Sequence, residues 1–365
     1  MRQRVMPKVA VQIPAWNQCE ELVDCLNSLK KVKYPNLEVI VINNGEDNTS
    51  EVVKRDFKWV TLIEEGIDLG FCRANNIGFR YCLKKKFDYI LLLNGDTKIF
   101  SETIEKLLNV MQNDPSIAIA GAKNILMENP AYMWGQYGKV TWGPMLVSTA
   151  GRFKPDLHLS QPPVDVDWVI CNGCMIRCSV LKEIGLFDEN YWMSDEDVEW
   201  SFRARRNGYR TIYVDSAAIL HKGSSSTNVK NKTKVFSYGY FLGRNPILFA
   251  KKYAGLHQKV WLFFNIFVGL LSRIIYALIL ILNNAFRLFL RYNYNVLHNM
   301  GSNILNEARS NRYFIRGVID GIRDEISHDY IYIEIKRKSV PEEKPAPVRT
   351  FKNGYMDKFR RWMGY

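Results

Sequence analysis

Two short stretches of this 365-residue chain combine residue types that could do chemistry together. The first, Asn94-Gly95-Asp96-Thr97, follows the apolar run Tyr89–Leu93, so that run is predicted to be a buried strand ending in a turn. Asp96 would then stand at the carboxyl end of a strand, where open α/β sheets bind ligands. The second, Ser194-Asp195-Glu196-Asp197, opens a predicted helix with a cluster of acids. A lone carboxylate suits a divalent cation, and an acid cluster suits a general base.

Each stretch also has a structural interpretation. Asn-Gly-Asp is an ordinary turn sequence, and Ser194 could cap the following helix with Asp197 at the capping-box position. Taken together, the two stretches favour the chemical interpretation, in which Asp96 binds a cation and Asp197 is the general base. Glu196 would then orient the base or contact the molecule from which the base takes a proton.

Strands separated by helices are predicted around the first stretch. Four apolar runs predict strands at 9–13, 37–42, 60–63 and 89–93. Helical patterns lie between them, near 19–30, 50–56 and 73–84. The alternation predicts an α/β fold with a mostly parallel sheet between covering helices.

The second stretch belongs to a less regular part of the chain, which begins at about residue 115. A helix is predicted over 194–207, stopped by Gly208, and a strand follows at 211–214. Glu199 and Arg203 are four residues apart in this helix, so they are expected to pair on its surface.

A third region, after about residue 235, is rich in apolar residues. The run Trp261–Leu282 is long enough to span a bilayer, but Arg273 within it would make a lipid-facing span costly, by about 2.5–3.5 kcal/mol. We prefer helices lying in the plane of a membrane, ahead of a true span and of a buried oligomer interface. The basic, aromatic segment Lys358–Met363 suits contact with an anionic surface. A solvated tail is an equally good interpretation of this segment.

The net charge of +13 favours anionic partners such as nucleotide phosphates or an anionic membrane face. The chain carries no zinc finger, basic zipper or RNA-binding signature, so no nucleic-acid partner is expected.

The seven cysteines are odd in number, and no signal-peptide pattern opens the chain, so reduced cytoplasmic thiols are expected. Cys171, Cys174 and Cys178 are closely spaced, but a zinc site would need a fourth ligand, for which His221 is the one candidate. We therefore expect these cysteines to be small apolar core residues rather than zinc ligands.

Four blocks, in this order and spacing, resemble the family 2 inverting glycosyltransferases with the GT-A fold, and most of all their rhamnosyltransferase-like members. The blocks are 9–17, 41–45 with 68–71 and 75–78, 93–97, and 185–189 continuing through 196–203 to 221–224. Arg244-Asn245 and the segment 316–321 also resemble downstream features of those members.

The resemblance implies a metal-dependent enzyme that moves a sugar, with inversion, from a nucleotide-diphosphate donor to a hydroxyl. Rhamnose from a thymidine-linked donor (dTDP-rhamnose) is the leading donor, and a lipid-linked, polyprenyl-linked or cell-surface glycan is the implied acceptor. Mg²⁺ or Mn²⁺ is the implied cofactor, because a cation offsets the charge of the diphosphate leaving group. The expected place is the cytoplasmic face of a membrane, with peripheral or single-span attachment. A homo-oligomer remains open.

The expected organisation is a GT-A domain over residues 1–235, with a nucleotide-sugar half at 1–113 and an acceptor half carrying the base at 114–235. A helical, membrane-associated region at 236–330 and a basic tail at 331–365 would follow.

The resemblance also assigns site residues. Asp197 and Glu196 are the implied catalytic pair, and Asp96 with His221, the late histidine of the family, would hold the metal. Donor binding is assigned to Pro14, Ala15, Asn17, Asn43, Arg73, Asn76, Asn94, Gly95 and Asp96. Asn43 and Asn94 stand where the family usually or commonly has Asp, which leaves hydrogen bonding but adds no charge.

Three other functions compete. A processive polysaccharide synthase usually carries Gln-x-x-Arg-Trp and several spans, whereas Arg361-Trp362 here lacks the Gln. A glycoside hydrolase also uses two carboxylates but does not explain the metal motif. A non-catalytic relative that binds nucleotide sugars, or scaffolds a glycan-assembly complex at a membrane, is favoured only by Asn43 and Asn94.

Overall fold

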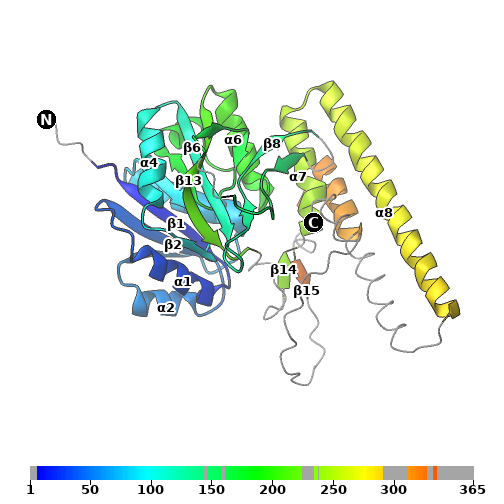
Figure 1. Cartoon of the computed structure of the whole chain (residues 1–365), viewed down its shortest axis with the longest axis horizontal. Helices are drawn as coiled ribbons and strands as arrows, with labels where there is room; N and C mark the ends of the chain where they lie inside the picture. The colour runs from blue at the N-terminus through cyan, green and yellow to red at the C-terminus, as the bar shows by residue number, and fades with distance from the viewer. Residues whose placement is uncertain are drawn as a thin grey trace, which may run out of the picture.

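The central feature of the molecule is a mixed sheet with helices on both faces (Figure 1). The computed structural model describes residues 6–142, 146–157, 161–223, 234–236, 238–290, 311–326 and 332–334. Among these residues ten strands form the sheet, whose main path runs β10-β13-β6-β12-β4-β1-β2-β3. The predicted α/β fold is confirmed.

The first half of the sheet is parallel. It consists of β1 (Val9–Ala15), β2 (Leu37–Asn43), β3 (Val60–Glu64) and β4 (Tyr89–Leu92). Every residue of β1 is buried because the strand lies between β2 and β4 and is covered on both faces. Such a strand reads as a continuous apolar run rather than an alternating one.

Helices cover the two faces of this sheet in two sets. The helices α1 (Cys19–Leu29), α2 (Thr49–Asp56) and α4 (Thr103–Asn113) contribute to the core on one face. The helices α3 (Gly70–Lys84), α5 (Cys178–Ile184) and α6 (Glu196–Arg206) contribute to the core on the other. Both faces are therefore dry, and functional side chains must come from strand ends and loops.

The second half of the sheet is mixed. Its strands are β5 (Thr97–Ile99), β6 (Ile117–Leu126), β7 (Met133–Gly135), β10 (Val164–Asp165), β12 (Cys174–Arg177) and β13 (Arg210–His221). β12 runs antiparallel to both β4 and β6, and β13 runs parallel to β6. The strand predicted at 211–214 is too short, because a register shift between Val214 and Ala218 lets β13 continue to His221.

Smaller elements flank the sheet. A three-stranded sheet is formed by β8 (Tyr137–Val140), β9 (Val147–Thr149) and β11 (Trp168–Val169), and the 3-10 helix η1 (Glu189–Tyr191) precedes α6. The structure describes all seven cysteines, and they are free thiols. Cys171, Cys174 and Cys178 are buried in an apolar cluster, which confirms that they are core residues.

The third region begins with the short strand β14 (Lys234–Phe236) and helix α7 (Tyr238–Tyr253). β14 pairs antiparallel with β15 (Tyr332–Glu334), which lies much later in the chain. α7 lies against the α/β unit (Figure 1), and a helix at 311–323 packs against both α7 and the long helix α8 (Leu256–Leu290). Phe249 of α7 shares an apolar cluster with Val198 of α6, so residues from both sides of the predicted boundary at 235 form one core.

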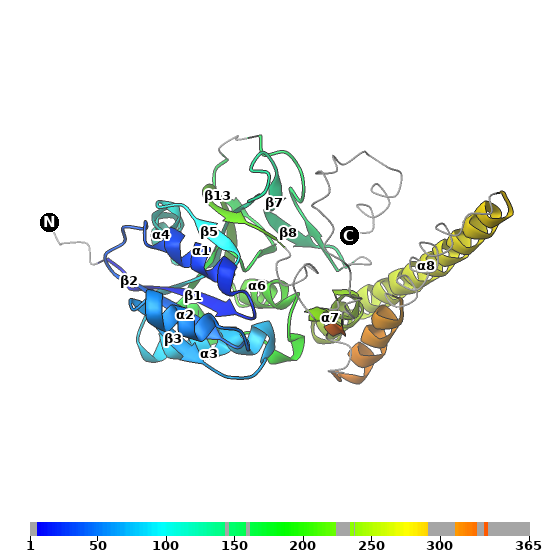
Figure 2. The same ribbon diagram turned by 90° about the horizontal axis from the view of Figure 1, so that it is seen from below.

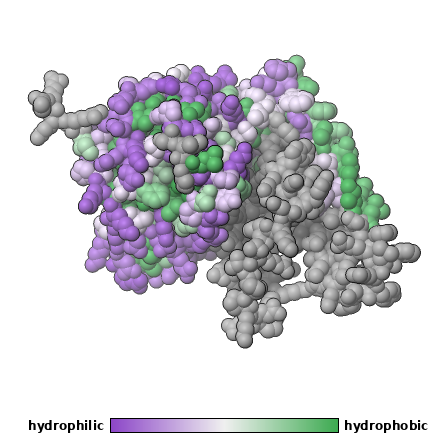
Figure 3. Space-filling model, viewed as in Figure 1, coloured by the Kyte–Doolittle hydropathy of each residue, from purple (hydrophilic) through white to green (hydrophobic). Residues whose placement is uncertain are grey.

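Helix α8 projects away from the rest of the molecule (Figure 2). In the described part of the chain it is the one helix long and apolar enough to cross a membrane, over Leu256–Tyr276, and 17% of that window is buried. Apolar side chains gather along its outer edge (Figure 3). The predicted tail at 331–365, apart from β15, lies outside the described residues.

Candidate active site

The two predicted metal ligands meet at one edge of the sheet. β5 pairs antiparallel with the end of β13, with Thr97 opposite His221, so Asp96 lies beside the last residue of β13. The His221 Nε2 and Asp96 Oδ1 atoms are 3.3 Å apart, and both side chains are only 5% exposed. The Lys222 backbone N–H donates to the Asp96 carbonyl oxygen at 3.1 Å. Two residues from distant parts of the chain are thus joined by strand pairing.

These two side chains fit a small divalent cation. The Nδ1 atom of His221 is buried and has no hydrogen-bond partner among the described residues, and the His221 ring lies 4.8 Å from that of Trp134. No group of three or more acidic, His or Cys side chains suited to a metal occurs in the described part of the chain. One carboxylate and one imidazole leave coordination positions for phosphate oxygens, which is how Mg²⁺ and Mn²⁺ commonly bind with nucleotides.

The turn that carries Asp96 is held by Asn172, a residue that the sequence did not single out. The Asn172 Oδ1 atom accepts hydrogen bonds from the Asn94 backbone N–H and the Thr97 hydroxyl, each at 2.9 Å. Asn172 is 2% exposed, and it lies in the loop just before β12. At Gly95 a Cβ would lie 2.7 Å from the Nε2 atom of Gln18, so a larger residue there would require the Gln18 side chain to move.

The predicted donor-binding residues of the first half meet at the ends of β1 and β2. Ala15, which follows Pro14 at the end of β1, lies opposite Asn43 of β2. Asn17 has a left-handed backbone (φ 48°), and its Oδ1 atom accepts from the backbone N–H groups of Glu46 and Asp47. Asn17 therefore ties the two loops into one surface at the carboxyl ends of the strands.

Asn43 itself shapes the second of these loops. Its Nδ2 donates to the Ser50 hydroxyl at 2.8 Å, and its Oδ1 accepts from the Gly45 N–H at 3.1 Å. Because a Cβ on Gly45 would lie 2.6 Å from the Asn17 backbone N, the two loops approach closely only with glycine there.

Two other predicted donor residues contact a different segment. Arg73 Nε forms an ion pair with Glu189 at 3.1 Å. The Asn76 amide is buried, donates to the Phe187 carbonyl and to Glu189, and accepts from the Phe187 N–H. In the structure, Arg73 and Asn76 join α3 to residues 187–189 instead of meeting the Asp96 turn. A donor contact by Arg73 stays a prediction.

The loop before the acid cluster has an unusual backbone. Trp192, Ser194 and Asp195 have φ values of 58°, 69° and 62°. These values lie in the left-handed region, which costs a non-glycine residue about 1–3 kcal/mol. The helix begins at Glu196 after Asp195, and no side chain caps it. The structural alternative, in which Ser194 caps the helix and Asp197 completes a capping box, is therefore wrong.

The Asp197 carboxylate faces the backbone of a neighbouring loop. Its Oδ2 accepts from the Cys171 N–H at 3.3 Å, and its Oδ1 accepts from the Val198 N–H at 2.9 Å. Burial raises the pKa of Asp197 to about 6, although the backbone hydrogen bonds oppose that rise. A carboxylate with a pKa near neutrality is suited to accept a proton.

The neighbouring acids are also perturbed. Burial and the charge of Asp197 raise the pKa of Asp195 to about 7 and also raise that of Glu196. One carboxylate oxygen of Glu196 is buried without a hydrogen-bond partner in the described part of the chain. Three acids so close together share their protons, and like charges keep part of the cluster protonated near neutral pH.

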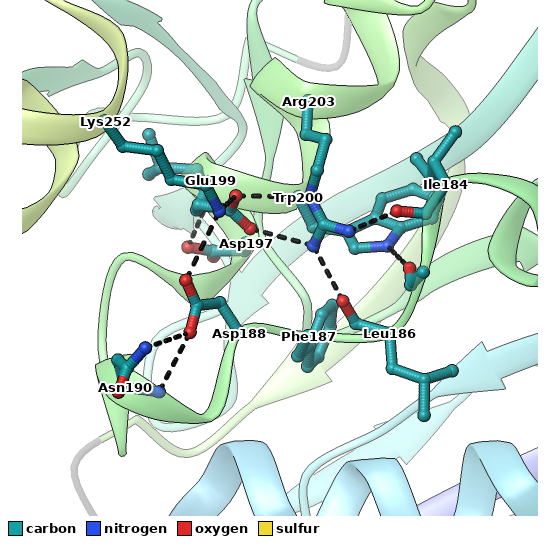
Figure 4. Close-up of polar contacts among 12 residues, drawn as sticks. Ile184, Leu186, Phe187, Asp188, Asn190, Asp197, Glu199, Trp200, Arg203 and Lys252 are labelled. Carbon is teal, nitrogen blue, oxygen red and sulfur yellow. Dashed lines mark hydrogen bonds and ion pairs between the residues drawn. The ribbon is translucent and has the colours of Figure 1, made fainter.

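Glu199 and Arg203 pair as predicted, and the pair is more buried than a surface contact (Figure 4). Arg203 also donates to the carbonyl groups of Ile184 and Leu186, so its role is to hold the segment before η1. Glu199 is fully buried and accepts from Lys252 Nζ at 2.6 Å and from the Tyr253 hydroxyl. These last two residues belong to α7, and no local sequence pattern predicts this contact.

Comparison with known proteins identifies the class of the first part of the chain, which includes the parallel half of the sheet. Residues 10–185 match the model of "Glycosyl transferase family 2". The chain therefore contains a glycosyl transferase family 2 domain, as predicted.

Curated relatives support a glycosyltransferase enzyme. The chain is 27% identical over 199 residues to dTDP-rhamnosyl transferase RfbF of Shigella flexneri, covering 54% of this chain and 64% of that protein. It is 25% identical over 211 residues to poly-beta-1,6-N-acetyl-D-glucosamine synthase of Staphylococcus aureus (strain COL), covering 55% and 46%. The chain thus spans less than two thirds of the length of these curated relatives.

Solved structures show the same fold at low sequence identity. The mannosyltransferase PcManGT of Pyrobaculum calidifontis, in complex with GDP-Man and Mn²⁺, has a TM-score of 0.50 at 14% identity and covers 88% of this chain and 89% of its own. GalNAc-T7 with UDP, GalNAc and Mn²⁺ has a TM-score of 0.50 at 15% identity and covers 60% and 44%. The predicted GT-A fold is confirmed.

Proposed function

We propose that this protein is a metal-dependent inverting glycosyltransferase that moves a sugar from a nucleotide-diphosphate donor to an acceptor hydroxyl. The observation that carries the proposal is the meeting of Asp96 and His221 at the sheet edge. Asp96 lies inside the segment that matches the family model, and His221 follows that segment. The carboxylate cluster at Asp195–Asp197 supplies the second requirement, a base with a pKa near neutrality.

The reaction assigned to these residues is a single displacement. Asp197 takes the proton of the acceptor hydroxyl, and the hydroxyl oxygen bonds to the anomeric carbon of the donor sugar. The bond from that carbon to the diphosphate oxygen breaks, and the nucleoside diphosphate leaves with the electron pair. A cation held by Asp96 and His221 would offset the charge of the leaving diphosphate.

The leading donor is dTDP-rhamnose. It is suggested by the earlier resemblance and by the relative that is named a dTDP-rhamnosyl transferase, while the family leaves other nucleotide sugars as alternatives. Pro14, Ala15, Asn17 and Asn43 would meet the nucleoside at the ends of β1 and β2, and Asn94, Gly95 and Asp96 would meet the diphosphate.

The proposed acceptor is a lipid-linked or cell-surface glycan, and the proposed place of the enzyme is the cytoplasmic face of a membrane. The surface of α8 supports contact with a membrane. The exposed apolar residues of this helix include Trp261, Phe263, Phe264, Phe267, Leu271, Ile274, Ile275 and Leu278. Arg273 donates to Asn311 at 3.1 Å and lies over the Phe314 ring. Its guanidinium group therefore contacts polar and aromatic side chains of the helix at 311–323. The main objection to lipid contact along α8 is thereby reduced.

The test of the proposed activity is a thermal-shift panel of thymidine, uridine, guanosine and cytidine diphosphates, each with and without Mn²⁺. A ligand that binds the folded state raises apparent stability by mass action. We expect one nucleotide to stabilise the protein only with the metal, and we expect Asp96→Ala to remove that shift. Absence of a metal-linked shift with every nucleotide would overturn the proposal and favour a non-catalytic relative.

Flotation with lipid vesicles tests the membrane proposal. The wild-type protein is expected to float with vesicles containing phosphatidylglycerol, and a variant with Phe264→Asp and Phe267→Asp on α8 is expected to stay behind. The matched control is Trp59→Asp, which changes an exposed aromatic residue on the α/β unit. Unchanged flotation of the α8 variant, or its conversion from an oligomer to a monomer without any vesicle effect, would refute membrane contact through α8.

A further inference from the structure

We infer that α7 is a positioning element for the general base, and that Arg244 and Asn245 hold the loop at 188–195 in the conformation from which Asp197 can act. This inference rests on the proposed function of Asp197. It assigns a task to a helix that lies outside the segment matched by the family model.

The 188–195 loop needs external support. Trp192, Ser194 and Asp195 all have left-handed backbones, and none of them is glycine. Such conformations persist only where the surrounding structure holds them, and they are concentrated at functional sites. The loop leads directly into Glu196 and Asp197, so its backbone sets where the first turn of α6 points.

Asn245 supplies that support from α7. Its Nδ2 donates to the carbonyl oxygens of Met193, at 2.9 Å, and of Ser194, at 2.7 Å. One amide therefore fixes two successive carbonyl groups, which define the turn at Ser194. Asn245 is fully buried, and no water would replace these hydrogen bonds without a local opening.

Arg244 holds the start of the same turn. Its Nη1 donates to the Asn190 carbonyl at 2.6 Å, and its Nε donates to the Glu325 carbonyl at 2.6 Å. Arg244 is 2% exposed, which is unusual for a guanidinium and marks a group fixed on all sides. The carbonyl groups of residues 190, 193 and 194 are thus all bound by two adjacent side chains of α7.

The far end of α7 holds the other side of the base. Lys252 donates hydrogen bonds to both Asp188 and Glu199 (Figure 4). These two residues precede and follow Asp197 in the sequence. Phe249 packs in the same apolar cluster as Val198, the residue next to Asp197. The contacts of α7 therefore surround Asp197 in sequence on both sides.

A second helix backs α7 against the loop. Cβ atoms on Gly317 and Gly321 would lie 2.0 Å from the Tyr240 carbonyl oxygen and 2.8 Å from that of Arg244, so these glycines allow close approach of the helix at 311–323 to α7. The Tyr240 hydroxyl donates to Asp320 at 2.7 Å. The segment 316–321, noted in the sequence without a task, therefore supports α7.

The expected consequence is separable from folding and from donor binding. Asn245→Ala should lower kcat by about 10–100-fold, because small misplacements of a reacting group cost rates of this order. The donor KM and the nucleotide- and metal-dependent thermal shift should stay unchanged, since the hydrogen bonds that hold the Asp96 turn come from Asn172 and Lys222, which lie outside α7. Lys252→Met, at a side chain 42% exposed, should lower kcat by a smaller factor without threatening the fold.

Rescue by a glycine distinguishes positioning from a general loss of stability. Glycine adopts left-handed backbones freely, so Ser194→Gly should recover part of the kcat of Asn245→Ala when the two are combined. The matched control is Asn265→Ala, which removes another buried amide whose Nδ2 donates to the Trp261 carbonyl within α8. The control should leave kcat unchanged.

Hydrogen exchange gives a readout that does not depend on activity. Amides at 189–195 should exchange faster in Asn245→Ala than in wild type, while those of β4 and β5 should not change. Wild-type kcat in Asn245→Ala, or unchanged exchange at 189–195, would overturn the inference. If the wild type neither transfers nor hydrolyses any donor while the exchange result holds, the proposed function fails and the structural support by α7 stands.

Discussion

The Asp96 turn and the 188–195 loop place their acidic residues by different means. The Asp96 turn joins two strands of the sheet, and strand pairing and the buried Asn172 within the α/β unit fix it. The 188–195 loop has three left-handed residues and is held by side chains from α7. The residue proposed to bind the cation is thus held by contacts within the α/β unit, whereas the loop before the proposed base is also held by a helix that follows that unit.

The two regions also differ in how charge is handled. Asp96 lies against an imidazole, a partner with which it can share a cation. Asp197 lies with Asp195 and Glu196; burial favours its protonated form, and its charge in turn raises the pKa of both neighbours. In the proposed function, the first carboxylate binds a cation and the second takes a proton.

The largest expected effect comes from removing the base. Asp197→Asn should lower transfer by about 10³-fold, within the range attributed to general base catalysis, while metal-dependent nucleotide binding stays intact. Because the folded-state pKa of Asp197 is raised to about 6, its charge at pH 7 costs stability, so this variant should also unfold at a higher temperature. Transfer assays and thermal unfolding at pH 7 test both parts; full transfer activity would remove the base assignment.

On the other side of the comparison, His221→Ala should weaken the apparent affinity for Mn²⁺ by at least about tenfold, the lower end of what disturbing a metal site costs. The measurement is the Mn²⁺ dependence of the nucleotide thermal shift. His257→Ala is the control, because His257 is an exposed histidine on α8. An unchanged Mn²⁺ dependence would separate His221 from the metal.

The pH dependence of kcat should report the base region alone. Only the charged Asp197 takes a proton, so kcat should fall by about tenfold per pH unit well below pH 6 and level off above it. The acids facing it are Asp195 and Glu196, while Glu199 is paired with Arg203 and Lys252. A low-pH limb centred near pH 4 would show that burial does not raise this pKa.

The smallest effect on rate is expected from Asn172→Ala. Loss of its amide leaves the Asn94 N–H and the Thr97 hydroxyl without their buried acceptor, at a cost of about 1–3 kcal/mol in the free energy of unfolding. The donor KM should rise a few-fold with little change in kcat, the opposite of Asn245→Ala. Chemical denaturation and steady-state kinetics on the two variants compare the regions directly, and identical kinetic profiles would contradict their separation.

Much of this arrangement was predictable. The apolar run before Asn94 placed Asp96 at the end of a strand, and the order of the blocks predicted the fold and the family. The four-residue spacing of Glu199 and Arg203 predicted their pairing. The alternative in which Ser194 caps the helix was wrong, since Asp195 directly precedes the helix and no side chain caps it. The Ser194 backbone is left-handed, and its carbonyl accepts a hydrogen bond from Asn245, about 50 residues away. For Arg73 and Asn76 the donor assignment stays a prediction; the contacts that the structure adds are with residues 187–189, more than a hundred residues later in the chain.

By itself the sequence determined the strands, their alternation with helices, and the residue types at the strand ends. These features follow from local apolar patterns and turn chemistry. The tertiary structure alone decided that β5 and β13 bring Asp96 to His221, that Asn172 holds their turn, and that α7 holds the loop before Asp197. Those contacts join residues that no local pattern relates, and they form only when distant elements pack against one another.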